Sequence, residues 1–265
     1  MSVKAVLFDL DDTLLWDDRS VSEAFKATCR YGAEATGVDE NELEAAVRRE
    51  ARALYETYET FSFTQMIGIN PFEALWGKFE AGEHPMFRKL QQIAPEYRSN
   101  AWTRGLAALG VDQPGLGLQL AEMFPAQRRK LKYVYEETFA ILDELKKSYK
   151  LLLLTNGSPD LQQEKLDGVP ELIPYFDSIV ISGNFGEGKP SSNLFAHAME
   201  QIGIRPEEGI MVGDKLTTDI LGANRIGMTS VWINRHNTVR SDEIIPAYEI
   251  KSLTELSDLL KSLNS

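Results

Sequence analysis

Three aspartates near the start of the chain could hold a cation or take part in a reaction. Asp9, Asp11 and Asp12 follow directly after the apolar residues 6–8. Carboxylates at the end of a buried strand are costly unless they serve a cation or a reaction. Asp9 would be the last strand residue, and Asp11 returns to the same side two positions on if the backbone stays extended. A solvated turn with capping aspartates explains the same residues equally well.

A hydroxyl, an amide and a glycine end a second apolar run. Residues 151–154 are all leucine and lead into Thr155, Asn156 and Gly157. A threonine hydroxyl and adjacent backbone N–H groups could hold the oxygens of a phosphoryl group. An ordinary strand-to-helix turn, with Ser158 as the helix cap, is the alternative interpretation.

Lys189 is a candidate cation for an anionic group. Gly183 and Gly188-Lys189 satisfy the spacing of a phosphate-binding P-loop, but Pro190 occupies the position that must supply a magnesium-binding hydroxyl. Proline also lacks the N–H that such a loop directs at phosphate, so the sequence excludes a P-loop. Lys189 remains a cation held before a proline, of the kind that an anionic transition state needs. A surface lysine in a turn is the alternative.

A further carboxylate that could bind a metal follows the apolar residues 209–212. Asp214 comes one glycine later, and Asp219 lies at the start of the next helical stretch. Mg²⁺ is typically held by one or two carboxylates, with waters and substrate phosphate completing an octahedron. Asp9 and Asp214 supply that number. Asp219 also suits a helix N-terminus, where the dipole favours a carboxylate, and this is compatible with a supporting role.

These polar residues all follow short apolar runs separated by helical patterns. Such runs, rich in Val, Ile and Leu, are typical of strands buried on both faces of a parallel sheet. The sequence therefore predicts an α/β fold with a doubly wound, Rossmann-like parallel sheet, whose carboxyl edge is where ligands bind. The expected strands lie at residues 3–8, 151–154, 178–182, 209–212, 230–233 and 248–250.

A long stretch after the first expected strand contains helical patterns and no convincing strand. In residues 72–79, for example, apolar side chains fall at i, i+3, i+4 and i+7. The simplest architecture is an all-helical module inserted into the α/β domain. We expect an α/β core domain of residues 1–16 and 131–265 and a helical cap domain of residues 17–130. Further helices within the cap are expected at residues 86–96, 101–109 and 115–130.

The order of these segments resembles the haloacid dehalogenase superfamily of phosphohydrolases over essentially the whole chain. The position of the helical insertion looks like the helical-cap (C1, subfamily I) type. The resemblance implies that Asp9 attacks phosphorus to form an aspartyl-phosphate, which water then hydrolyses. It implies that Asp11 protonates the departing alkoxide and later deprotonates the water. The phosphate-binding residues implied are Thr155, Asn156 and Lys189.

The same resemblance implies a Mg²⁺ cofactor. Its ligands would be Asp9, Asp214 and the carbonyl oxygen of Asp11. Asp219 would orient Lys189 or a metal-bound water. The dehalogenases of the family lack a carboxylate at the position of Asp11, so halide displacement is not expected.

The expected function is hydrolysis of a phosphomonoester of a small metabolite. The size of the cap suits a partly enclosed site, and phosphoserine is slightly preferred as substrate. The alternatives are a sugar-phosphate or nucleoside-monophosphate phosphatase, a phosphosugar mutase and, more remotely, a non-catalytic interaction protein with the same fold. The mutase branch usually carries Gly-Val where this chain has Asp12-Thr13.

Composition limits the partners and the compartment. The 265 residues carry a formal net charge of −12, which disfavours extended binding to nucleic acid or to anionic membrane surfaces. Cys29 is the only cysteine, so a reducing compartment is the natural interpretation. With neither a signal peptide nor an apolar run long enough to span a membrane, we expect a cytoplasmic protein. Either a monomer or a homodimer is compatible with the sequence.

Overall fold

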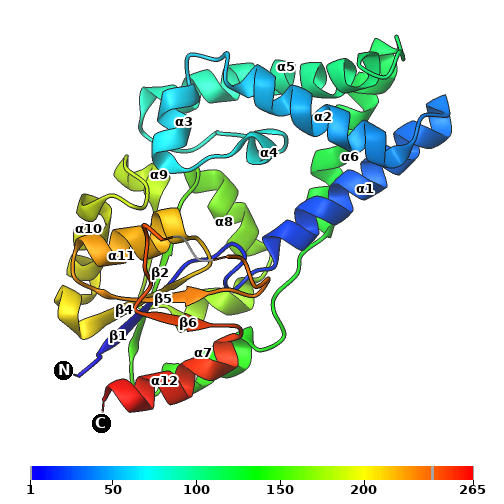
Figure 1. The fold of residues 1–265 in the computed structure, drawn as a ribbon. Helices are drawn as coiled ribbons and strands as arrows, with labels where there is room; N and C mark the ends of the chain where they lie inside the picture. The colour runs from blue at the N-terminus through cyan, green and yellow to red at the C-terminus, as the bar shows by residue number, and fades with distance from the viewer. Residues whose placement is uncertain (1, 240–241, 265) are drawn as a thin grey trace. The chain divides into compact units, whose positions relative to one another are not determined.

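One parallel sheet forms the centre of the α/β part of the molecule. The computed structural model describes residues 2–239 and 242–264. The strand order is β3-β2-β1-β4-β5-β6, with β1 in the middle and the chain winding outward to both sides (Figure 1). The predicted doubly wound α/β fold is therefore confirmed. The strands are β1 (Ala5–Phe8), β2 (Lys150–Thr155), β3 (Ser178–Ile181), β4 (Gly209–Gly213), β5 (Thr229–Ile233) and β6 (Tyr248–Ile250).

Each face of the sheet has its own hydrophobic core, because side chains alternate along every strand. Leu7 and Leu152 pack with α10 (Ser192–Ile202) and α11 (Leu221–Arg225). Phe8 and its neighbours pack with α7 (Thr138–Leu145) and α12 (Leu256–Leu263) on the other face (Figure 1). The remaining short elements are α8 (Pro159–Asp167), α9 (Ser182–Phe185), η1 (Pro170–Tyr175), η2 (Pro206–Glu208), η3 (Leu216–Ile220) and η4 (Leu253–Glu255).

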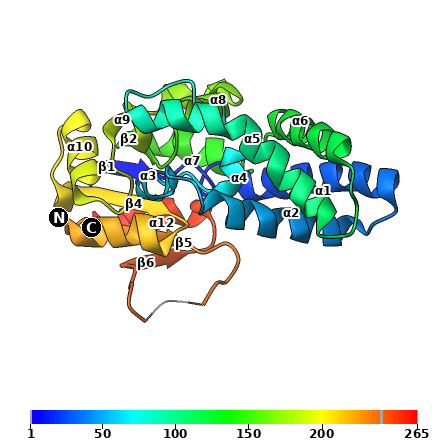
Figure 2. The same cartoon turned by 90° about the horizontal axis from the view of Figure 1, so that it is seen from above.

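The inserted segment is helical, as the sequence predicts, and has a separate hydrophobic core. Its long helices pack against one another in pairs, α1 with α2 and α6, and α5 with α2 and α6 (Figure 2). Phe25, Trp102 and Phe124 meet at the centre of this core. The helices are α1 (Asp17–Thr36), α2 (Glu40–Tyr55), α3 (Phe61–Ile67), α4 (Pro71–Ala74), α5 (Pro85–Ala107) and α6 (Pro114–Lys130).

One boundary inside this segment differs from the prediction. The helices expected at residues 86–96 and 101–109 are a single helix, α5, which continues through Pro95. A proline inside a helix removes one backbone hydrogen bond. Leu90, Ala94, Tyr97 and Ala101 nevertheless form one continuous buried face, and this packing maintains the helix.

The chain divides into two compact units. The α/β unit comprises residues 1–16, 134–157 and 165–265, and the helical unit comprises residues 17–133 and 158–164. Residues 131–133 and the first part of α8, which the sequence analysis assigns to the α/β domain, group with the helical unit. Among the described residues, no helix combines the length and apolar character needed to cross a membrane.

Candidate active site

The central strand carries Asp9 to the carboxyl edge of the sheet. Phe8 is in register with Leu153 of β2 and Val212 of β4, so the residues that follow these strands emerge at the same edge. The Asp9 N–H donates to the Val212 carbonyl oxygen over 3.0 Å, which extends the pairing with β4 by one residue. The topology therefore brings Asp9, Thr155 and Asp214 to one edge, as the sequence predicts for parallel strands.

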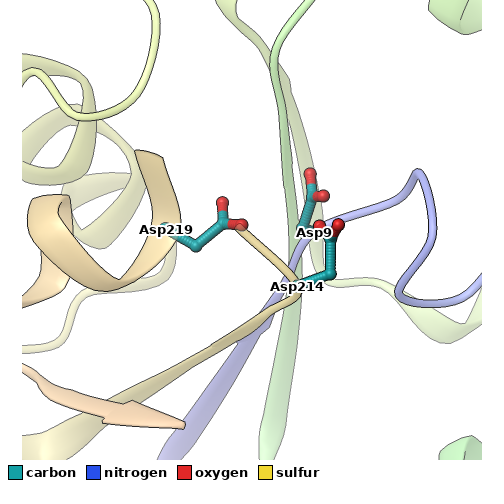
Figure 3. Close-up of side chains that lie close together, drawn as sticks. All are labelled: Asp9, Asp214 and Asp219. Atoms are coloured by element: carbon teal, nitrogen blue, oxygen red, sulfur yellow. The ribbon is translucent and has the colours of Figure 1, made fainter. Parts of the chain in front are cut away.

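Three carboxylates gather at this edge. Asp9, Asp214 and Asp219 each offer an oxygen atom, and these atoms lie within 4.8 Å of one another (Figure 3). Asp219 comes from η3, a π-helical turn, and its carboxylate accepts a hydrogen bond from the Lys215 N–H. An all-oxygen set of this kind fits a hard divalent cation such as Mg²⁺.

Gly213 allows Asp219 to approach the strand end. A Cβ atom built on Gly213 would lie 2.4 Å from the Asp219 Cγ atom, which is closer than any real contact permits. Only glycine therefore leaves space for this carboxylate beside β4. Gly213 thus leaves space for the Asp219 carboxylate, and Asp214 supplies a carboxylate of its own.

Lys189 is buried among these groups. Its Nζ atom lies 2.6 Å from Asp9 Oδ1 and 2.7 Å from Asp219 Oδ1, and it donates to the Leu154 carbonyl oxygen over 2.7 Å. Only 2% of the Lys189 side chain is exposed. The alternative of a surface lysine in a turn is therefore wrong. This ammonium group holds two carboxylates and the end of β2 together.

Asn156 fixes the loop that carries Lys189. The Asn156 Nδ2 atom donates to the Lys189 carbonyl oxygen over 3.0 Å, and the Lys189 N–H donates back to Asn156 Oδ1 over 2.7 Å. The Gly157 N–H donates to Ser182 Oγ over 2.9 Å. The Asn156 side chain thus holds Lys189 in place. The predicted contact with phosphate would be made by the backbone N–H of Asn156. Thr155 is fully buried beside it.

Asp11 lies in a tight loop, not in an extended strand. Leu14 and Leu15 both donate their N–H groups to the Leu10 carbonyl oxygen, and the Asp12 N–H donates to Leu15. Asp12 has φ 58°, a left-handed conformation that aspartate tolerates better than most residues. Among the described residues, the Asp11 side chain is outside the carboxylate group around Asp9. It turns toward α8.

Lys165 of α8 is the partner of Asp11 and was not identified from the sequence. Its Nζ atom lies 2.8 Å from Asp11 Oδ2, and only 4% of the Lys165 side chain is exposed. The local pattern around residue 165 is that of any helix lysine. The signal that identifies it is burial, which the sequence does not give directly.

The electrostatics of the site show an excess of negative charge. Burial raises the pKa of Asp9 to about 6; Lys189 opposes this shift and Asp219 adds to it. Burial, and then the charge of Asp9 and Asp219, hold the pKa of Asp214 well above its ordinary value. Burial lowers the pKa of Lys189, but Asp219 and Asp9 outweigh it and the net shift is upward. A divalent cation would relieve this repulsion, so the residues fit Mg²⁺.

A pocket of ≈ 290 Å³ opens beside Asp214 in the α/β unit. Lys215, Arg235 and His236 are among its lining residues. Arg235 is paired with Glu137, with 2.6 Å between Nη1 and Oε1, and lies over the Tyr135 ring. The pocket therefore places the cationic side chains of Lys215 and Arg235 next to the carboxylate group.

The chain is similar to several known proteins. A family model described as haloacid dehalogenase-like hydrolase matches residues 3–227. A phosphoserine phosphatase from Thermus thermophilus is 35% identical over 96% of this chain and 98% of its own length. A glyceraldehyde 3-phosphate phosphatase from Methanopyrus kandleri is 30% identical over 98% of both chains. The magnesium-bound crystal structure of the HAD-hydrolase YfnB from Bacillus subtilis has a TM-score of 0.68 at 23% identity, covering 98% of this chain and 99% of YfnB, and shows the same fold.

Proposed function

This chain belongs to the haloacid dehalogenase-like hydrolases, and on that basis we propose that it is a magnesium-dependent phosphomonoesterase of small metabolites. It is an enzyme of the phosphatase type. The two phosphatases compared above align with this chain over nearly their whole length. The observation that carries the proposal is the buried group of Asp9, Lys189 and Asp219 at the edge of the sheet, with Asp214 beside it.

Asp9 is the proposed nucleophile. One of its carboxylate oxygens forms a bond to phosphorus while the bond from phosphorus to the ester oxygen breaks. Lys189 holds Asp9 Oδ1 at 2.6 Å and so limits the directions in which the carboxylate can point. Asp11 gives its proton to the departing alkoxide, which leaves as an alcohol. The products of this half-reaction are the alcohol and an aspartyl-phosphate on Asp9.

The second half-reaction restores Asp9. Asp11, now ionised, accepts a proton from a water that attacks phosphorus, and the bond from phosphorus to the Asp9 oxygen breaks. Inorganic phosphate and the free carboxylate result. Asp11 regains the proton that it gave in the first half-reaction, so the cycle closes without a further reactant except water.

The proposed metal ligands are the Asp9 and Asp214 carboxylates and the Asp11 carbonyl oxygen. When bound, Mg²⁺ neutralises negative charge that spreads onto the phosphoryl oxygens. The close approach of the carboxylates supports this assignment, and so does the raised pKa of Asp214, which burial and then the charges of Asp9 and Asp219 cause. The proposed role of Asp219 is to orient Lys189, which it contacts over 2.7 Å. In this proposal it does not bind the metal.

The phosphoryl oxygens are assigned to Thr155, Asn156 and Lys189. The Thr155 hydroxyl and the Asn156 backbone N–H are donors at the carboxyl end of β2, and donors fixed before the reaction lose no free energy to reorganisation. The hydrogen bonds between Asn156 and the Lys189 backbone support this role, since they hold both donors in one rigid loop.

Phosphoserine is the substrate we favour. The Thermus relative is a phosphoserine phosphatase, and the pocket beside Asp214 is lined by Lys215, a cation that suits a substrate with a carboxylate. A sugar-phosphate or nucleoside-monophosphate phosphatase and a phosphosugar mutase are the alternatives. The Methanopyrus relative acts on glyceraldehyde 3-phosphate, by its name, and favours the sugar-phosphate alternative.

The domain assignment and the location form part of the proposal. We assign the helical unit to the cap domain, which selects the substrate, and the α/β unit to the chemistry. A cytoplasmic location is supported by the single cysteine, Cys29, which is buried and unable to form an intrachain disulfide.

The test is release of inorganic phosphate from a panel of phosphometabolites and p-nitrophenyl phosphate, with and without Mg²⁺. We expect turnover that requires Mg²⁺ and is fastest for phosphoserine. Asp9→Asn should abolish it, and acid-quenched reactions with labelled substrate should leave label on the wild-type protein only. The exposed Asp258→Asn variant is the matched control. Absence of Mg²⁺-dependent turnover for every member would contradict the proposal, and an isomerised product without stoichiometric phosphate would indicate the mutase.

A further inference from the structure

A second buried lysine of the α/β unit lies against the proposed proton carrier. Lys165 Nζ is 2.8 Å from Asp11 Oδ2, with 4% of the Lys165 side chain and 24% of the Asp11 side chain exposed. Lysine is almost never buried without a partner, because removing its charge from water costs several kcal/mol. The burial of Lys165 therefore needs an explanation, and the mechanism proposed above assigns this residue no role.

Packing holds the backbone at one end of the ion pair, and hydrogen bonds hold it at the other. Leu166, the next residue on α8, is completely buried in the core beneath the sheet, which fixes the backbone of Lys165. On the other side, Leu14 and Leu15 both close the catalytic loop by donating to the Leu10 carbonyl oxygen. The contact thus joins the part of α8 that belongs to the α/β unit to a hydrogen-bonded loop, and it favours one orientation of the Asp11 carboxylate.

This orientation matters for proton transfer. A general acid must lie within hydrogen-bond distance of the oxygen that it protonates. A displacement of about 1 Å in such a group costs on the order of 100-fold in rate. Holding Asp11 Oδ2 at one point gives the other oxygen, Oδ1, a defined direction as well.

Building on the proposed function, we infer that Lys165 is a positioning residue that orients Asp11 for protonation of the leaving group. The two buried lysines then have separate roles. Lys189 orients the nucleophile, Asp9, and Lys165 orients the acid, Asp11. Lys165 touches neither the substrate nor the reacting phosphorus in this assignment, and it acts on the reaction through Asp11.

The leaving group provides a test that separates positioning from a structural role. An alkyl phosphate such as phosphoserine needs a proton on its departing oxygen, whereas p-nitrophenolate departs without one. The ratio kcat/KM reports only the steps up to departure of the leaving group, so the later hydrolysis of the aspartyl-phosphate does not enter it. We expect Lys165→Met to lower kcat/KM for phosphoserine by about 100-fold and for p-nitrophenyl phosphate by less than about fivefold.

Lys165→Arg and Lys4→Met complete the design. Lys165→Arg keeps the cation and should recover most of the alkyl-to-aryl ratio. Lys4 pairs with Glu208 over 2.6 Å before the start of β1, and Lys4→Met, the same chemical change, should leave both substrates unaffected. Thermal melts accompany each variant. Where Lys165→Met does not fold, Lys165→Gln, which keeps a donor without the charge, takes its place with the same expected order of losses.

The outcomes are distinct. An equal loss for both substrates, or no loss for either, would overturn the positioning role while the phosphatase remains established by the wild type. Absence of wild-type turnover of every phosphate ester in the panel would overturn the proposed function, and the role of Lys165 with it. If the wild type turns over only another alkyl phosphate of the panel, that ester replaces phosphoserine in the comparison.

Discussion

At the scale of single residues, the ammonium group of Lys189 is shared between two carboxylates of the site. Lys189 contacts Asp9 and Asp219 with nearly equal distances, 2.6 and 2.7 Å. Removing one partner of a buried charge leaves the other partner uncompensated. The direction in which Lys189 points is therefore set by Asp219 as much as by Asp9.

The first prediction concerns Asp219. We expect Asp219→Asn to lower kcat by about 10- to 100-fold, the range found for residues that orient groups bound at a reactive centre. The physical reason is that Lys189 would lose one of its two carboxylate partners and pull Asp9 out of position. Steady-state kinetics on the best substrate measure the effect, with Asp258→Asn as the control.

Gly213→Ala provides an independent check on the same idea. The added Cβ atom would meet Asp219 Cγ at 2.4 Å and displace this carboxylate without removing its charge. Its loss of kcat should resemble that of Asp219→Asn. Normal kcat in both variants would show that Asp219 does not orient Lys189.

The second prediction is a pH dependence of stability at Glu137. Burial raises the pKa of this carboxyl, but the hydrogen bond from Arg235 and further contacts outweigh burial, and the net shift is downward. A depressed pKa contributes stability above the ordinary value of about 4.3, and this contribution is lost as the pH falls through the folded pKa. Glu137→Gln should cost on the order of 1 kcal/mol at neutral pH.

Urea unfolding of the wild type and Glu137→Gln across the pH range measures this difference. The free-energy difference should be constant at neutral pH and should shrink below about pH 4. In an Arg235→Met background it should nearly disappear, because the charged partner is gone. A difference that grows as the pH falls would contradict the assigned sign.

The proximity of Asp9 and Asp214 was predictable because each follows an apolar run, and runs that form parallel strands end at one edge. The period and order of the segments are enough to predict this. Lys165 lies on a helix, and every turn of a helix has side chains that contact some neighbour. Its neighbour is known only once α8 is packed, so local pattern alone could not identify it.

At the scale of elements, local sequence does not determine where the helices of the inserted segment begin and end. Pro95 and Asn100 are poor helix formers, and two helices were expected where α5 is continuous. Tyr97 explains the continuity: its hydroxyl donates to the Pro71 carbonyl oxygen over 2.8 Å, and its ring is buried. Such contacts come from distant segments and override local propensity.

The third prediction concerns the packing of α5 against α2. A Cβ atom on Gly105 would lie 2.4 Å from Val47 Cγ2 and 3.0 Å from Val47 Cα. Because part of this obstruction is backbone, Gly105→Ala should destabilise the helical unit by about 1–3 kcal/mol. Differential scanning calorimetry measures the loss.

Gly115→Ala is the matched control. Gly115 lies in α6 and has nothing within 4 Å of the added atom. Alanine is the better helix former by up to about 1 kcal/mol, so this variant should be neutral or slightly more stable. Equal stability of the two variants would show that α2 and α5 are not closely packed at Gly105.

At the scale of the whole molecule, the two units have separate hydrophobic cores and different sources of instability. The helical unit is stabilised by its aromatic core around Phe25 and Trp102. The α/β unit places three carboxylates against one buried lysine, which costs stability until a cation is bound. Ligand effects on stability should therefore be confined to the α/β unit.

The fold and the edge of the sheet were predictable at this scale because alternating strands and helices permit few topologies. The division of α8 was not. Residues 159–164 of α8 group with the helical unit, and residues 165–167 group with the α/β unit. A pattern of apolar positions shows that a helix exists, but it does not show which core each of its turns joins.

The last prediction is metal-dependent stability. Mg²⁺ at about 100 times its Kd should stabilise the protein by about 2.7 kcal/mol, or roughly 5–10 °C in the transition of the α/β unit. Asp214→Asn removes one carboxylate from the group, so the metal-free variant should be more stable than the metal-free wild type and should lose most of the Mg²⁺ shift. Calorimetry with EDTA and with Mg²⁺ measures both effects, and Asp258→Asn should behave as wild type. An undiminished shift in Asp214→Asn would place the stabilising cation elsewhere, because the carboxylate proposed to bind it would be absent.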